Sequence, residues 1–176
     1  MSKSNTALFN NPLNFFKIMK RITLLLVSFF FYSALQAQTF DSQAVEEADK
    51  QFEASFASKN LEAMFQPIAS DCIFYGTDRS ERWDVTSFKT MIEAGMKNGI
   101  PAMNVISREI TSLAEGKIAV VVKQIGWAIF KTELREVAVY EKQKEGWKMK
   151  SFSLNLLIPN QKIKALNEMM TGQSKK

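Results

Sequence analysis

Apolar residues in the first half of the chain recur at intervals of three or four positions, the spacing of one face of a helix. This spacing predicts three helices, at about 42–58, 60–66 and 86–98. The third is the most regular, because every inward position of its template is apolar or glycine: Phe88, Met91, Ile92, Gly95 and Met96. Residues that can accept backbone hydrogen bonds precede each helix and are its expected N-caps: Asp41 or Ser42, Asn60 and Thr86.

The pattern then changes to that of strands. A short strand is predicted at 72–75, and four long ones follow, at 105–113, 117–127, 132–143 and 147–157. The turns between the long strands are short, so we expect them to pair antiparallel as a meander. Helices first and strands second predict an α+β fold, in which the helices cover one face of a strongly bent, mostly antiparallel sheet.

Residues 1–37 follow a third pattern, that of a leader and secretory signal. A basic pair at 20–21 precedes an apolar run at 22–35, and the small residue Ala37 follows. As a helix this run would cover about 21 Å, short of the roughly 30 Å hydrocarbon core, which favours a cleaved signal over a membrane anchor. We expect cleavage after Ala37, a periplasmic or secreted protein, and no stable membrane anchor after signal removal.

Charge changes this interpretation little. The chain has 23 basic and 18 acidic residues, a balance that alone would suggest an anionic partner. Four of the bases lie in the first 37 residues, which contain no acid, so 19 bases face 18 acids in the remainder. We therefore expect no nucleic-acid partner. The sequence leaves open whether translation starts at Met1 or at Met19, directly before the basic pair.

The remainder, residues 38–176, is expected to form a single domain held by its core. Its one cysteine, Cys72, allows no internal disulfide and lies far from the cleavage point, so lipid attachment is not expected. A chain of about this length buries roughly 68–70% of its unfolded surface, which is enough for a core.

The loop at 75–83, reading YGTDRSERW, holds the densest group of reactive side chains and connects the short strand to the third helix. Connections of this kind often line binding sites. Together with the order of elements, three segments resemble the SnoaL-like branch of the NTF2-like superfamily over about 41–160: Gly76-Thr-Asp-x-x-Glu81-x-Trp83, the helix from Thr86, and Gly146-Trp147-x-Met149 with the strand after it.

This resemblance implies an NTF2-like cone with an internal pocket, and a homodimer formed through the outer face of the sheet. It implies little about activity, because the fold hosts enzymes and binding modules alike. Many relatives have histidines on the last strand where this chain has Ser151 and Ser153. The chain has no histidine, which excludes a histidine base and histidine-ligated metals. No phosphate or dinucleotide motif is present, so we expect no cofactor and no metal site.

Proton chemistry would then need a carboxylate in a partly dry pocket. Asp78 is the first candidate and Glu81 the second, with Tyr75 or Tyr140 as a hydrogen-bond donor. Each has an ordinary structural alternative. Asp78 can bond the backbone of its own turn, Glu81 can pair with a neighbouring arginine, and the tyrosines can be half-buried strand residues.

The expected pocket walls are Trp83, Met91, Trp127 and Tyr140, with Ser151 and Ser153 from the last strand. The two serines enter this set because strict alternation places them on the same side as Trp147 and Met149. The leading hypothesis is an exported domain that binds a small, largely apolar molecule. The alternatives are a histidine-independent isomerase or lyase that uses Asp78, and an interaction module with a vestigial pocket.

Overall fold

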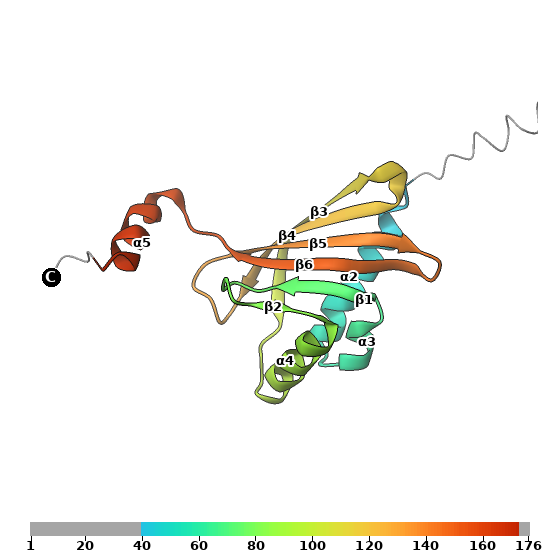
Figure 1. The fold of residues 1–176 in the computed structure, drawn as a ribbon, viewed down its shortest axis with the longest axis horizontal. Helices are drawn as coiled ribbons and strands as arrows, with labels where there is room; N and C mark the ends of the chain where they lie inside the picture. The colour runs from blue at the N-terminus through green and yellow to red at the C-terminus, as the bar shows by residue number, and fades with distance from the viewer. Residues whose placement is uncertain (1–39, 173–176) are drawn as a thin grey trace, which may run out of the picture. The chain divides into compact units, whose positions relative to one another are not determined.

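The computed structural model describes residues 40–172, which belong to one compact unit (Figure 1). The predicted signal, residues 1–37, lies outside the described residues. Over residues 40–172 the observed class is α+β, as predicted: four helices and a six-stranded, mixed, curved and unclosed sheet. No helix between residues 40 and 172 is long and apolar enough to span a membrane.

Three helices are found where the helical spacing predicts them, at Ser42–Ala57 (α2), Leu61–Phe65 (α3) and Val85–Lys97 (α4). The N-caps of the first two are Asp41 and Asn60, whose side chains accept the amides of Ala44 and Ala63 at 3.0 and 3.1 Å. The predicted cap of α4, Thr86, is wrong. Asp84 takes that position and accepts the Ser87 amide at 2.7 Å, because an aspartate two residues earlier offers a better acceptor.

The strand order in the sheet is β2-β1-β6-β5-β4-β3. The strands are Ile68–Tyr75 (β1), Arg82–Trp83 (β2), Met103–Leu113 (β3), Ile118–Trp127 (β4), Leu134–Gln143 (β5) and Gly146–Leu156 (β6). β3 to β6 form the predicted antiparallel meander. β1 pairs with β6 in parallel and with β2 antiparallel, so the loop after β1 is a hairpin before it reaches α4.

The helices α2, α3 and α4 cover one face of the sheet (Figure 1). α2 packs against β3 and β6, and α4 packs against β1. Aromatic rings fill the space between these layers: Phe74 of β1 and Phe88 of α4 stack with centroids 3.7 Å apart. Phe152 of β6 lies within 6.2 Å of both rings. These core contacts thus join α4 to the parallel strands β1 and β6.

An irregularity in β6 overturns the predicted placement of the two serines. Opposite β6, Tyr140 pairs with Met149 but Val139 pairs with Ser151, so Lys150 is an extra residue. One extra residue reverses the faces of every position after it. Trp147 and Met149 are buried before the bulge, and Phe152 and Leu154 are buried after it. Ser151 and Ser153 therefore lie on the outer face of the sheet.

Two short 3₁₀ turns, Ala114–Gly116 (η2) and Asn160–Lys162 (η3), and a terminal helix, Ile163–Met170 (α5), complete the described chain. η2 makes the β3–β4 turn, in which Glu115 and Gly116 have left-handed backbone angles. α5 carries no buried residue, and its apolar side chains include the exposed Ile163, Met169 and Met170.

Candidate functional site

A cavity of about 220 Å³ lies where α2, α4, the β1–β2 hairpin and the β4–β5 connection meet. Eight of the eighteen lining residues are aromatic, among them Phe52 and Phe56 from α2, Trp83 from β2, Phe88 from α4, and Trp127 and Phe130 from the end of β4 and the segment after it. Methionine and aliphatic side chains form most of the remaining wall, together with Gly76, Thr77 and Glu81. This composition is typical of a small-molecule pocket, where apolar walls surround a few polar groups.

Three of the predicted wall residues line this cavity: Trp83, Met91 and Trp127. Tyr75, predicted as a hydrogen-bond donor, lines it as well. Trp127 also has a structural role, because its Nε1–H donates to the Pro101 carbonyl at 2.8 Å and fixes the indole. Large apolar residues at inward positions are the signal that identified these side chains.

Three predicted wall residues lie elsewhere. The bulge in β6 turns Ser151 and Ser153 to the outer face of the sheet. Tyr140 faces inward but lies beneath α2, fully buried, and its hydroxyl donates to Asp49 at 3.0 Å. None of the three lines the cavity.

Asp78 is exposed and does not line the cavity. Its carboxylate accepts the Ser80 amide at 2.8 Å and the Ser80 hydroxyl at 2.5 Å. These hydrogen bonds hold the pKa of Asp78 below its usual value, whereas a general acid near neutral pH needs a raised pKa. The structure thus favours the turn-forming alternative for Asp78 and argues against the acid/base role.

Glu81 is the only charged side chain among the described residues that line the cavity. Its Oε2 accepts the Asp78 amide at 3.0 Å, and its own carbonyl accepts the Gly76 amide at 3.1 Å. A Cβ on Gly76 would lie 2.8 Å from Cδ and 2.9 Å from Cβ of Glu81. Gly76 therefore leaves the space that the Glu81 side chain occupies. This contact explains why the GTDxxExW segment has a glycine together with its glutamate.

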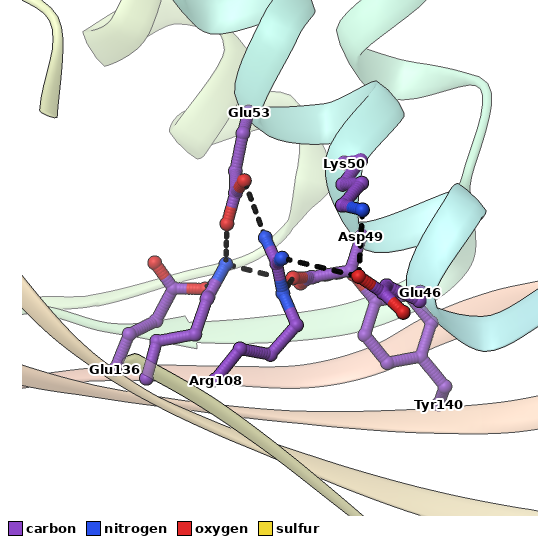
Figure 2. A network of polar contacts seen from close by, with 8 residues as sticks. Glu46, Asp49, Lys50, Glu53, Arg108, Glu136 and Tyr140 are labelled. Atoms are coloured by element: carbon purple, nitrogen blue, oxygen red, sulfur yellow. Dashed lines mark hydrogen bonds and ion pairs between the residues drawn. The ribbon is translucent and has the colours of Figure 1, made fainter. Parts of the chain in front are cut away.

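A second polar group lies between α2 and the sheet, and is called here the buried ionic network: Asp49, Glu53, Arg108, Lys123, Glu136 and Tyr140. Figure 2 shows Asp49 and Glu53 extending from α2 toward side chains of the sheet, among them Arg108, Glu136 and Tyr140. Asp49 is fully buried. Its carboxylate accepts from Arg108 Nε at 2.9 Å, Lys123 Nζ at 3.0 Å and the Tyr140 hydroxyl at 3.0 Å.

Lys123 connects three carboxylates within this network. Its Nζ lies 3.0 Å from Asp49, 2.7 Å from Glu53 and 2.5 Å from Oε1 of Glu136, the last an ion-pair contact without hydrogen-bond geometry. Burial alone would lower the pKa of Lys123, but the three carboxylates outweigh burial and raise it.

The network contains more acidic than basic side chains. Arg108 contacts Asp49 and Glu53, so three buried or half-buried acids face two cations. Burial raises the pKa of Glu136 to about 7 against the opposing effect of Lys123. Burial, followed by the charge of Asp49, raises the pKa of Tyr140 well above its usual value. No network residue lines the cavity.

The sequence interpretation missed this network. A signal was present, because Lys123 continues the inward alternation of Ala119 and Val121 on a strand that is otherwise apolar at its centre. Asp49 likewise falls on the buried face of α2, four residues after Val45. A charged residue at an inward position predicts a buried partner of opposite charge. Among residues 40–172, no cluster of acids or cysteine has an arrangement suited to a metal ion.

Comparison with known proteins agrees with the fold. The sequence-family model for the SnoaL-like domain matches residues 45–159, and the chain belongs to this family. A putative ketosteroid isomerase from Shewanella frigidimarina is 19% identical over 68% of this chain and 98% of its own, with a TM-score of 0.54. An NTF2-like protein of unknown function from Pseudomonas putida is 10% identical over 69% and 92%, with a TM-score of 0.56.

A domain of unknown function with a cystatin-like fold, from Nostoc punctiforme, is 12% identical over 76% of this chain and 88% of its own, with a TM-score of 0.60. At these identities the likeness shows an NTF2-like fold and no activity. No curated protein matches the chain. The predicted family and fold class are confirmed.

Proposed function

We propose that this protein binds a small, largely apolar molecule in the cavity between α2, α4 and the β1–β2 hairpin. The observation that carries the proposal is the composition of the wall, in which aromatic and aliphatic side chains surround a single carboxylate. An apolar cavity of roughly 150 Å³ can hold a benzene molecule. The cavity of about 220 Å³ is therefore large enough for a body of one or two fused rings.

Binding is favoured over catalysis because the acid with a neutral-range pKa is in the wrong place. Glu136, whose pKa burial raises to about 7, is 1% exposed and does not line the cavity. Asp78, the acid of the enzyme hypothesis, has a lowered pKa and is exposed. A general acid or base must come within hydrogen-bond reach of its substrate, so neither position supports an isomerase or lyase.

The experiment is a calorimetric titration of the protein with 2-naphthylmethanol, a neutral two-ring probe. We expect saturable binding to one site per chain. Met91→Trp, which fills the cavity from α4, should weaken this binding at least tenfold. Met169→Trp adds the same ring at a residue that is 66% exposed and should leave the affinity unchanged. Absence of binding, or equal binding to Met91→Trp, would overturn the proposal.

The composition of the outer face of the sheet supports the proposal that two chains form a homodimer through this face. Val120, Val139 and Ser151 lie side by side across β4, β5 and β6, and Val122, Val137 and Ser153 form a parallel row. These side chains are half-exposed in the single chain. Four valines and two serines in these rows provide a largely apolar surface of small side chains, and exposed apolar surfaces commonly mark interfaces.

Sedimentation equilibrium tests this assembly. The protein should have twice the mass of one chain, and Val139→Lys, at the centre of the face, should be monomeric. Ser112→Lys is the control and should remain dimeric, because this exposed residue of the edge strand pairs with Ala119, whose buried side chain lies on the opposite face of the sheet. A monomeric protein at 100 µM, or a dimeric Val139→Lys variant, would contradict it.

Export is the remaining part of the proposed function, and the N-terminal pattern supports it. The intact mass of protein recovered from the periplasm of an expressing bacterium should correspond to a chain that begins at Gln38. A cytoplasmic protein that retains its N-terminal residues would contradict export.

A further inference from the structure

The cavity that we propose as a ligand site is electrostatically one-sided. Glu81 is charged, and no lysine or arginine is among the described residues that line the wall. An anionic ligand would place a second negative charge beside Glu81 with no counter-charge. An unpaired charge that leaves water for such a site is costly. The wall therefore disfavours acids as ligands.

The Glu81 side chain is held in place and still has an acceptor to offer. The Asp78 amide binds Oε2 at 3.0 Å, and the missing Cβ of Gly76 leaves room for the carboxylate. None of the hydrogen bonds or ion pairs found between residues 40 and 172 uses Oε1, and the neighbouring Arg79 and Arg82 form none with Glu81. A ligand donor can thus replace water at Oε1 without breaking a protein contact.

The aromatic wall favours the same sign of ligand charge. Trp83 follows Glu81 by two residues on the β1–β2 hairpin, and its ring, like those of Tyr75 and Trp127, lines the cavity. Aromatic faces carry partial negative charge and attract ammonium groups, tryptophan most strongly. A carboxylate and several ring faces around one space form an environment suited to an organic cation with an apolar body.

We propose that the cavity selects hydrophobic amines, with the apolar body among the aromatic rings and the protonated amine on the carboxylate of Glu81. This proposal rests on the proposed function, because it names the ligand class of the same cavity. Charge-assisted hydrogen bonds are stronger than neutral ones, so the amine should bind more tightly than a neutral molecule of equal size.

The test compares three probes with one ring system by calorimetry at pH 7: 2-naphthylmethylamine, which is cationic, neutral 2-naphthylmethanol and anionic 2-naphthoate. We expect the amine to bind about tenfold more tightly than the alcohol, and the carboxylate to bind most weakly. If the alcohol binds as tightly as the amine, the amine proposal fails and the proposed function stands. If no probe binds, both fail.

Two substitutions locate the effect. Glu81→Gln should weaken the amine about tenfold and leave the affinity for the alcohol within about twofold. Asp78→Asn is the matched control, because it removes one negative charge from the same hairpin at an exposed residue outside the cavity. It should leave the affinity for both probes unchanged. An equal loss of amine binding in the two variants would mean attraction by the general surface charge and would overturn the assignment of Glu81.

Discussion

The helix α2 borders two regions of opposite character. Phe52 lines a cavity with apolar walls and one carboxylate at its edge. Asp49, one turn earlier, is the centre of a buried ionic network that has five charged side chains, none of which lines this cavity. The cavity has room for a ligand and one charged side chain. The buried ionic network has five charged side chains, and none of them lines the cavity.

This difference shows why strongly shifted pKa values do not by themselves identify a functional site. Lys123, Glu136 and Tyr140 all have strongly raised pKa values, and these groups hold α2 onto the sheet. Their shifts follow from burial and mutual proximity. We interpret the network as structural and the cavity as the binding region, and the following substitutions separate the two roles.

The largest effect is expected from Lys123→Met in the buried ionic network. This change leaves Asp49, Glu53 and Glu136 together with one cation fewer. Loss of one partner from a buried ion pair typically costs about 3–5 kcal/mol in the free energy of unfolding. Urea denaturation at pH 7 measures it. Lys150→Met removes a more exposed partner of Asp71 from the same sheet, and should cost much less, because exposed ion pairs contribute little to stability. Equal losses would contradict the central role of Lys123.

The next effect is a pH dependence that arises from Glu136. Its pKa is raised from 4.5 to about 7 in the folded state, so the folded protein binds this proton more tightly than the unfolded chain does. Stability therefore falls as pH rises from about 4.5 to 7, by roughly 1–3 kcal/mol. Carboxylates with lowered pKa values, such as Asp71 and Asp84, lose their contributions at more acidic pH.

Urea denaturation at pH 5 and pH 8 measures this dependence. The unsubstituted protein should be more stable at pH 5, and Glu136→Gln should remove most of the difference, because glutamine has no proton to lose. An unchanged difference between the two pH values in the variant would assign it to another group.

Met91→Trp probes the cavity instead of the network. Its at least tenfold loss of affinity for 2-naphthylmethanol corresponds to about 1.4 kcal/mol or more of binding free energy. Lys123→Met, studied at a denaturant-free condition in which it remains folded, should bind the probe within about twofold of the unsubstituted protein. Loss of binding in that variant would mean that the two regions are coupled.

The smallest effect is expected from Asp78→Asn. The side chain is exposed and bonds only within its own turn, so the free energy of unfolding should hardly change. Thermal unfolding measures it. A larger loss would show that the turn helps to order the β1–β2 hairpin.

Sequence periodicity predicted most of the fold because helical and strand repeats encode which face is buried. Three of the helices and the meander were predicted in this way, and the structure confirms them. The predicted family, which rested on three sequence segments and the order of elements, is confirmed by the family match over residues 45–159. The bulge at Lys150 was not predicted, because strict alternation of inward and outward residues assumes an unbroken strand register. The serines were consequently assigned to the wrong face. The two-residue strand β2 is too short to have a period.

Part of the cavity wall was predicted from the size and apolar character of its residues. Trp83, Met91 and Trp127 are large apolar residues at inward positions. The direction of the Asp78 carboxylate depends on hydrogen bonds to Ser80 within the turn, which no periodic pattern encodes. The network depends on contacts between residues far apart in the chain, such as Asp49 and Lys123, and only the inward position of each charge indicated it.

A crystal structure of the protein grown with saturating 2-naphthylmethylamine tests the account most directly. It should show the naphthalene ring between Trp83 and Trp127, the amine within hydrogen-bond distance of Glu81, and the contacts of Lys123 with its three carboxylates unchanged. A probe bound elsewhere, or an amine that displaces Lys123 from its carboxylates, would contradict the separation of binding cavity and structural network.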